Sequence, residues 1–266
     1  MLAAPTISSA QTGRVSGAAV IQFGGGTVRN PLAPTRRVRA VLFDVDGTMY
    51  HQGRLRLLMA AELAAFAARR PLHGRRVLRA LSEYRRAQET LRHNGNKSGA
   101  SEQLALAATR TGLSPEEIGV IVDDWMNVRP LKYLAGCRAY GLNDLLAFLA
   151  TKRVPLGVLS DYPAAPKLDA MRVAERFSLV LCGGDAEIGA FKPSPRGFFA
   201  ACASWQLDAS DVLYVGDRVD VDAAGAAAAG MPAVIVTGSR LPKSSAAFAV
   251  SSLERLRHVL DDHNSR

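Results

Sequence analysis

The stretch VRAVLFDVDGT, residues 38–48, is the part of the sequence that decides the fold. Its apolar run is typical of a buried strand in a parallel sheet, because such strands are covered on both faces. Asp44 and Asp46 follow the run directly, and Gly47 permits the tight turn that could bring both carboxylates to one pocket. Two carboxylates held close together share either a proton or a cation. Taken alone, the pair would also suit a calcium-type or purely structural role.

Short strands and helices alternate after residue 134. We expect strands at 155–159, 179–181, 212–215 and 233–236, and helices at 142–152, 165–177, 195–205, 223–229 and 252–261. This alternation predicts an α/β fold in which helices cover both faces of a Rossmann-like parallel sheet. The predicted core is discontinuous and consists of residues 38–52 and 134–266.

The intervening residues 53–133 show helical periodicity throughout, and we expect helices at 55–69, 75–92, 101–111 and 114–126. The last of these opens on Ser114-Pro115-Glu116-Glu117, a capping box with proline at the first helical position. The sequence therefore predicts an all-helical domain inserted between the first strand of the core and the remainder.

Residues 1–37 are rich in Ala, Ser, Gly, Thr and Arg and show no periodic apolar pattern, which predicts a disordered extension. Arginine without acidic residues would also suit an organelle-targeting segment or a binding arm. We expect a cytoplasmic location, with an organelle as the alternative. Three widely spaced cysteines without a CxxC motif favour a reducing compartment. The sequence contains no run of about eighteen apolar residues, so we predict no membrane helix.

Further polar residues lie just past predicted strands, where an open α/β sheet builds its binding site. Ser160 ends the strand at 155–159, and Lys192 stands between a phenylalanine and a proline in FKPSP, residues 191–195. Asp217 and Asp222 belong to GDRVDVD, residues 216–222, with Asp220 as a competing acid. Lysine can act as a point charge for phosphate oxygens, and carboxylate oxygens suit Mg²⁺.

In this order, DVDGT, the strand-end serine, FKPSP and GDRVDVD resemble motifs one to four of the haloacid dehalogenase-like (HAD) hydrolase superfamily. The helical insert resembles the C1-type cap of that superfamily. The resemblance implies that Asp44 attacks phosphorus and that Asp46 protonates the leaving oxygen and then activates water. It also implies that Ser160 and Lys192 hold the phosphoryl oxygens.

The same resemblance implies a Mg²⁺ site formed by Asp44, Asp217 and the backbone carbonyl of Asp46, with Asp222 binding or supporting the metal. Residues next to the motifs are expected to contact substrate: Gly47, Thr48, Tyr50, His51 and Asp161. Asp161 could instead cap the next turn. The arginine-rich segment 69–92 is either a solvated helix or the source of a contact to a second anionic group of the substrate.

The resemblance implies a Mg²⁺-dependent phosphatase that hydrolyses a small phosphomonoester through an aspartyl-phosphate. Family dehalogenases lack an acid at the position of Asp46, and residues 49–59 lack the lysine that a family phosphonatase requires. A phosphomutase similar to β-phosphoglucomutase remains an alternative. The net charge of +9 suggests a second alternative, a non-catalytic basic binding protein on the same fold. We expect a small phosphorylated metabolite as partner, neither nucleic acid nor membrane, and leave the oligomeric state open.

Overall fold

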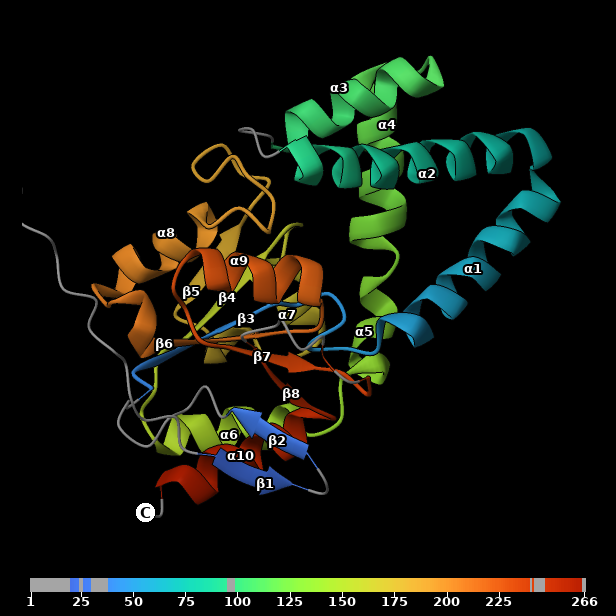
Figure 1. Cartoon of the computed structure of the whole chain (residues 1–266). Coiled ribbons are helices and arrows are strands. Elements are labelled where there is room, and N and C mark those ends of the chain that lie inside the picture. The colour runs from blue at the N-terminus through green and yellow to red at the C-terminus, as the bar shows by residue number, and fades with distance from the viewer. Residues whose placement is uncertain are drawn as a thin grey trace, which may run out of the picture.

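The computed structural model describes residues 20–23, 26–29, 38–94, 99–239, 241 and 247–264. Figure 1 shows a central sheet enclosed by helices, with a further group of helices, α1 to α4, extending from the sheet to one side. The molecule thus has two parts, a sheet-based core and a helical insert, and the site described below lies where they meet.

The central sheet has six parallel strands in the order β5-β4-β3-β6-β7-β8. These are β3 (Ala40–Phe43), β4 (Leu156–Ser160), β5 (Leu179–Cys182), β6 (Val212–Gly216), β7 (Ala233–Val236) and β8 (Phe248–Val250). The predicted α/β fold is confirmed. Because β3 lies between β4 and β6, the strand order reverses at β3, and open α/β sheets bind ligands at such a reversal.

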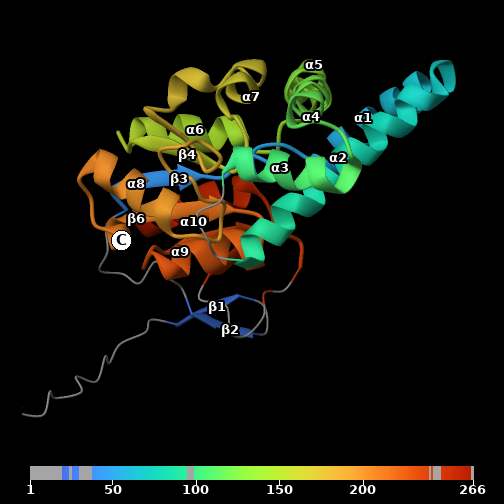
Figure 2. The ribbon, with the colours of Figure 1, turned by 90° about the horizontal axis from the view of Figure 1, so that it is seen from above.

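Helices cover both faces of the sheet because alternate strand residues point in opposite directions. Val41 and Phe43 belong to an apolar cluster that includes residues of α6, α7 and α10, whereas Leu42 belongs to a cluster with residues of α8 and α9. Figure 2 shows α6 and α7 on one side of the sheet and α8 and α9 on the other. The helices are α6 (Leu142–Thr151), α7 (Ala165–Ala170), α8 (Arg196–Trp205), α9 (Ala224–Ala228) and α10 (Leu253–Asn264).

The insert has an apolar cluster of its own, in which Tyr84, Ile118 and Trp125 are buried. Ser114 caps the fourth helix as expected, since its hydroxyl accepts a hydrogen bond from the Glu117 amide (3.2 Å) and the Glu117 carboxylate accepts one from the Ser114 amide (3.0 Å). The helices are α1 (Gln52–Arg69), α2 (Pro71–Asn94), α3 (Ala100–Thr111), α4 (Pro115–Val122), a π-helical segment (Asp123–Val128) and α5 (Leu131–Cys137).

The two chain segments that join the insert to the core lie side by side. Tyr50 and Arg138 form an antiparallel bridge, the His51 amide donates to the Cys137 carbonyl at 2.8 Å, and the Ala139 amide donates to the Met49 carbonyl at 2.8 Å. Helix α5 continues across the boundary expected between residues 133 and 134. The exact division into domains therefore stays a prediction.

Two predicted helices differ in extent from the observed ones. The helix expected at 165–177 ends at Ala170, because Arg172 adopts a left-handed conformation (φ 58°) that a right-handed helix cannot include. The helix expected at 223–229 is preceded by a π-helical turn, Val219–Ala223, which brings Asp222 next to the end of β6. The sequence does not predict β8, because three residues are too few to show a period.

Most of the segment predicted to be disordered, residues 1–37, lies outside the described residues. Within it the structure describes two strands, β1 (Val20–Phe23) and β2 (Gly26–Arg29), which pair in an antiparallel ladder. Whether the segment is disordered stays a prediction. Among the described helices, none combines the length and apolar character needed to cross a membrane.

Candidate active site

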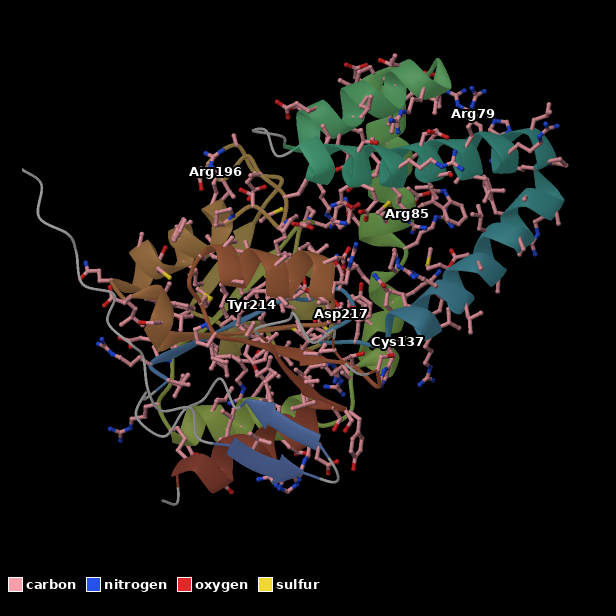
Figure 3. The ribbon with its side chains drawn as sticks, viewed as in Figure 1. Arg79, Arg85, Cys137, Arg196, Tyr214 and Asp217 are labelled. Atoms are coloured by element: carbon pink, nitrogen blue, oxygen red, sulfur yellow. The ribbon has the colours of Figure 1, made fainter. Side chains whose placement is uncertain are left out.

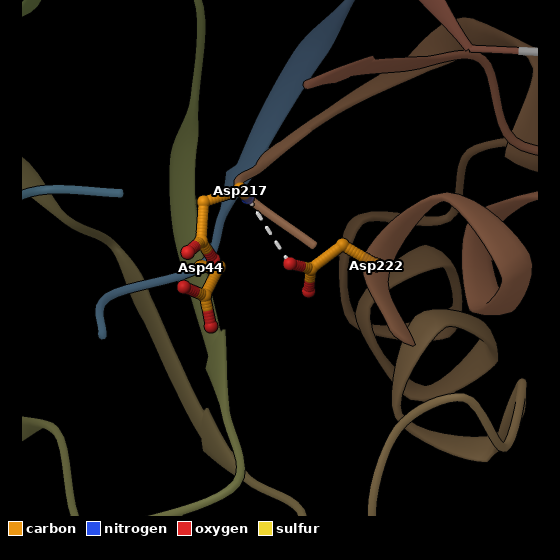
Figure 4. Close-up of side chains that lie close together, drawn as sticks. All are labelled: Asp44, Asp217 and Asp222. Carbon is orange, nitrogen blue, oxygen red and sulfur yellow. Dashed lines mark hydrogen bonds between the residues drawn. The ribbon is translucent and has the colours of Figure 1, made fainter. Parts of the chain in front are cut away.

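The carboxyl ends of β3 and β6 bring three aspartates together. Asp44 follows β3 directly, Asp217 follows β6, and Asp222 lies in the π-helical turn after β6. One carboxylate oxygen from each lies within 4.8 Å of the others (Figure 4). The turn is held in place because the Asp222 carboxylate accepts hydrogen bonds from the amides of Asp217 (3.1 Å) and Arg218 (2.9 Å).

Lys192 lies at the centre of this cluster and is buried. Its ammonium group donates to Asp44 Oδ1 at 2.5 Å, to Asp222 Oδ1 at 2.7 Å and to the Tyr214 hydroxyl at 2.9 Å. Burial alone would lower the pKa of Lys192, but the charges of Asp222 and Asp44 outweigh that effect, and the pKa is raised. Lys192 is therefore a cation with its three donors directed at fixed partners.

Asp44 and Asp217 are the two acids of this cluster whose pKa values are raised. Burial raises the pKa of Asp44 well above its ordinary value, and the neighbouring carboxylates add to this effect while Lys192 opposes it. Burial and the charge of Asp222 likewise raise the pKa of Asp217 to about 6. Because burial and neighbouring carboxylates disfavour the ionised form of both acids, a cation bound between them would favour it.

The donor set fits a small divalent cation. Mg²⁺ takes oxygen ligands and is usually held by one or two carboxylates together with water and substrate phosphate. Within the described residues, no side chain donates a hydrogen bond to the Asp217 carboxylate, so this carboxylate is available as a ligand. Both oxygens of Asp222 already accept protein donors, which suits a supporting role. Asp220 instead pairs with Arg218 (2.6 Å) and is exposed.

Gly47 allows the loop after β3 to approach this cluster. Its φ of 103° is in the left-handed region, where residues with a Cβ are strained, and a Cβ at this position would overlap the Asp217 carboxylate. The next residue, Thr48, donates its hydroxyl proton to Asp44 Oδ2 at 3.1 Å. These two residues position the carboxylates rather than line the cavity described below.

Asp46 is held by two residues of which only one belongs to the expected site. Lys167 of α7 donates to Asp46 Oδ1 at 2.6 Å and to Oδ2 at 2.7 Å, and the Tyr50 hydroxyl donates to Oδ1. Burial would raise the pKa of Asp46, but the charge and hydrogen bonds of Lys167, together with Tyr50, lower it. Sequence reasoning missed Lys167. The available signal was a lysine in the first helix after β4, at the carboxyl edge of the sheet.

Ser160 and Asp161, at the end of β4, are both buried. The Ser160 hydroxyl accepts a hydrogen bond from the Tyr162 amide at 3.3 Å. Asp161 Oδ1 accepts from the Lys192 amide at 2.9 Å, and Oδ2 accepts from the Arg92 guanidinium of α2. Asp161 therefore connects the backbone of Lys192 to the helical insert.

A cavity of about 1140 Å³ lies between the sheet edge and the inserted helices. Asp217 lies there in Figure 3, between the sheet and the insert. Of the expected site residues, the cavity is lined by Asp44, Asp46, Tyr50, Asp161, Lys192, Asp217 and Asp222. Thr48, Gly47 and Ser160 lie outside the lining, and His51 is exposed away from it. The lining also includes residues that the sequence did not single out, namely Gln88, Lys167 and Arg218.

A parallel sheet whose carboxyl edge carries these charged residues against an inserted helical unit is the architecture of an α/β enzyme. A family model of haloacid dehalogenase-like hydrolases matches residues 38–230. The chain belongs to this family, as its four motifs suggested.

Individual relatives are similar over most of their length. The chain is 29% identical over 216 residues to phosphoglycolate phosphatase of Shigella dysenteriae serotype 1 (strain Sd197), which covers 75% of this chain and 81% of the relative. The structure of 2-haloacid dehalogenase from Pseudomonas syringae pv. Tomato DC3000 matches with a TM-score of 0.59 and 22% identity, covering 85% of this chain and 99% of that one. The magnesium-bound putative HAD-hydrolase YfnB from Bacillus subtilis matches with a TM-score of 0.57 and 18% identity, covering 85% and 100%. The two structures share the fold.

Proposed function

We propose that this protein is a Mg²⁺-dependent phosphatase that hydrolyses a small phosphomonoester through an aspartyl-phosphate on Asp44. The observation that carries the proposal is the Lys192 ammonium, 2.5 Å from Asp44 Oδ1 within the cluster of three carboxylates. The name of the Shigella relative, a phosphatase, supports the reaction class, and the magnesium in YfnB supports the cofactor.

In the first step, an Asp44 oxygen forms a bond to phosphorus while the bond from phosphorus to the leaving oxygen breaks. Thr48 and Lys192 hold the Asp44 carboxylate, so the attacking group is oriented before substrate arrives. We propose that Lys192, which lines the cavity, then contacts the transferring phosphoryl oxygens. The same role for Ser160 stays a prediction from the sequence, since Ser160 lies outside the cavity lining. A loose phosphoryl-transfer transition state needs positioning and positive charge above all, and Lys192 supplies both.

Asp46 is the proposed proton carrier. It would give a proton to the leaving oxygen and later take one from the water that attacks phosphorus, which regenerates Asp44 and releases phosphate. Its carboxylate is fixed by Lys167 on both oxygens and by Tyr50 on one. We therefore assign Lys167 and Tyr50 as residues that position Asp46.

Asp44, Asp217 and the backbone carbonyl of Asp46 are the proposed Mg²⁺ ligands, with Asp222 as support. When bound, the cation supplies positive charge that stabilises the negative charge developing on the phosphoryl oxygens. Asp222 fixes the geometry by accepting hydrogen bonds from the amides on either side of the Asp217 carbonyl and from Lys192. Asp161, through the Lys192 amide, supports the same lysine.

The test is phosphate release from p-nitrophenyl phosphate with and without Mg²⁺. We expect Asp44→Asn to abolish turnover, because an amide is not a nucleophile for phosphorus, and we expect chelation of the cation to do the same. Asp144→Asn is the matched control, since Asp144 is an exposed residue of α6 outside the cavity. Substantial turnover by Asp44→Asn would refute the assignment.

The two alternatives differ from this proposal in measurable ways. A phosphomutase would transfer the phosphoryl group to a second hydroxyl of a sugar phosphate without releasing free phosphate. A non-catalytic basic protein would bind nucleic acid in a salt-sensitive manner and would do so equally well as Asp44→Asn.

A further inference from the structure

The catalytic cavity has two sides of opposite charge. On the core side, five aspartates face three basic residues, Lys167, Lys192 and Arg218. On the insert side, the charged lining consists of five arginines and two glutamates. A divalent cation would offset the excess of acids on the core side. On the insert side, Arg92 also pairs with Asp161 of the core, but the described residues give Arg56 and Arg85 no ion-pair partner.

Two of these arginines have no ion-pair partner among the residues that the structure describes. Arg56 of α1 and Arg85 of α2 form neither an ion pair nor a side-chain hydrogen bond with any residue in the described ranges, although both line the cavity. Glu83 pairs with Arg86 at 2.6 Å, and Glu89 pairs with Arg92 at 2.5 Å. Figure 3 shows Arg85 on the side of α2 that faces the core, while Arg79 lies nearer the start of α2, beside α3.

Two buried donors on α2 also lack a partner within the described part of the chain. Gln88 Nε2 and Arg92 Nε have no acceptor among the described residues, and both side chains line the cavity. Their other polar atoms are engaged, since Gln88 Oε1 accepts from the Tyr162 hydroxyl and the terminal nitrogens of Arg92 bind Glu89 and Asp161. Buried donors are almost always satisfied, and an anionic group in the cavity would supply the acceptors that these two lack among the described residues.

We propose that the insert side of the cavity binds a second anionic group on the leaving-group part of the substrate. Gln88 and Arg92 supply fixed hydrogen-bond donors, and Arg56 and Arg85 supply uncompensated positive charge. The substrate class is then a small phosphomonoester whose alcohol carries a carboxylate or a second phosphate. This inference rests on the proposed phosphatase function and specifies its substrate.

The proposed contact lies away from the bonds that change during phosphoryl transfer. Interactions that are equally strong in the ground and transition states alter KM and leave kcat largely unchanged. Loss of Arg56 and Arg85 should therefore appear as weaker binding of the anionic substrate, and a general structural defect would not give this pattern.

The experiment compares three phosphomonoesters: 2-phosphoglycolate; glycolamide phosphate, in which a neutral amide replaces the carboxylate; and ethylene glycol bisphosphate. For the wild-type enzyme, we expect a higher kcat/KM on a probe with a second anionic group, called an anionic probe, than on the amide. Whether 2-phosphoglycolate or the bisphosphate is preferred shows whether the second group is a carboxylate or a phosphate. In Arg56→Met/Arg85→Met, we expect the ratio of kcat/KM between the anionic and the amide probe to fall at least about 10-fold, through KM. Arg79→Met should leave that ratio unchanged, because Arg79 is an exposed residue of the same helix outside the cavity.

A second variant tests the orphaned donors. Gln88→Glu keeps an acceptor for the Tyr162 hydroxyl and replaces the unpartnered nitrogen with an oxygen, so it should also lower the ratio. An equal loss on the probes with a second anionic group and on the amide probe, or a wild-type preference for the amide, would overturn the inference. If p-nitrophenyl phosphate is hydrolysed, such a result leaves the phosphatase proposal intact. If no phosphomonoester is hydrolysed, the proposed function fails, and this inference fails with it.

Discussion

Lys167 Nζ lies 2.6 Å from Asp46 Oδ1 and 2.7 Å from Asp46 Oδ2, so one ammonium group binds both oxygens of the proposed acid–base residue. Lys167 belongs to α7, which follows β4, while Asp46 follows β3. The pair therefore links two adjacent strand ends. Tyr50, from the same loop as Asp46, adds a third donor, and all three side chains line the cavity.

We expect Lys167→Met to lower kcat by about 10-fold or more, because an acid–base group contributes roughly 10²–10⁴-fold only when it is correctly placed. Lys167 lowers the pKa of Asp46, so its removal should raise that pKa and move the corresponding limb of the pH–rate profile to higher pH. Lys167→Arg should restore part of the rate. Lys152→Met, at an exposed lysine after α6, is the control. An unchanged pH profile in Lys167→Met would rule out the positioning role.

Mg²⁺ should stabilise the protein more at pH 7.5 than at pH 5. The pKa of Asp217 is about 6 in the folded protein, against roughly 3.9 for an unperturbed aspartate. The folded state therefore binds more protons in this interval, so the contribution of Asp217 to stability is present below about pH 4 and is lost as the pH rises through about 6. A bound cation favours the ionised carboxylate and reverses that loss. The measurement is Tm with and without Mg²⁺ at both pH values, and an equal shift at each would contradict the expectation.

Breaking the buried pair between Arg92 and Asp161 should destabilise the protein strongly. The side chains are 9% and 6% exposed, and removing one member of such a pair leaves an uncompensated charge, which costs about 3–5 kcal/mol. We expect Arg92→Met to lower the free energy of unfolding by about that amount, and Arg92→Met/Asp161→Asn to recover much of it. Urea unfolding of both single variants and the double variant measures the coupling. Additive losses would show that the pair is not coupled.

Gly47→Ala should abolish Mg²⁺ binding and should also lower the free energy of unfolding. The new methyl group would overlap the Asp217 carboxylate, and the backbone at φ 103° would be strained. Gly112→Ala separates the two effects, because Gly112 also has a positive φ (74°) but has open space around the position of a Cβ. The control should lose about 1–2 kcal/mol of stability, the usual penalty for a left-handed conformation, and retain activity. Calorimetric titration with Mg²⁺ compares the two variants, and normal affinity in Gly47→Ala would disprove the steric role.

The sheet and the main charged cluster could be predicted because both depend on short-range patterns. Each strand is a short apolar run, and the ends of parallel strands meet at one edge, so Asp44 and Asp217 were expected to lie near each other. Lys192 was predicted to belong to the same site because it stands between a phenylalanine and a proline. The structure places all three together.

Other contacts depend on geometry that the sequence does not encode locally. The contact of Lys167 with Asp46 requires the angle of α7 against the sheet, and that of Arg92 with Asp161 requires the docking of the insert across 69 positions of sequence. His51, next to the first motif, is exposed and lies outside the cavity lining, and its amide is paired with the Cys137 carbonyl where the insert joins the core.

The paired backbone at Tyr50 and Arg138 has a consequence for how this chain can change. Since the outgoing and returning segments are already hydrogen-bonded to each other, the distance between them is independent of what is spliced between them. Helices of the insert could be lengthened, replaced or shortened beyond these two paired segments without displacing β3. The scaffold that holds the proposed nucleophile can thus stay constant while the part proposed to bind the rest of the substrate diversifies.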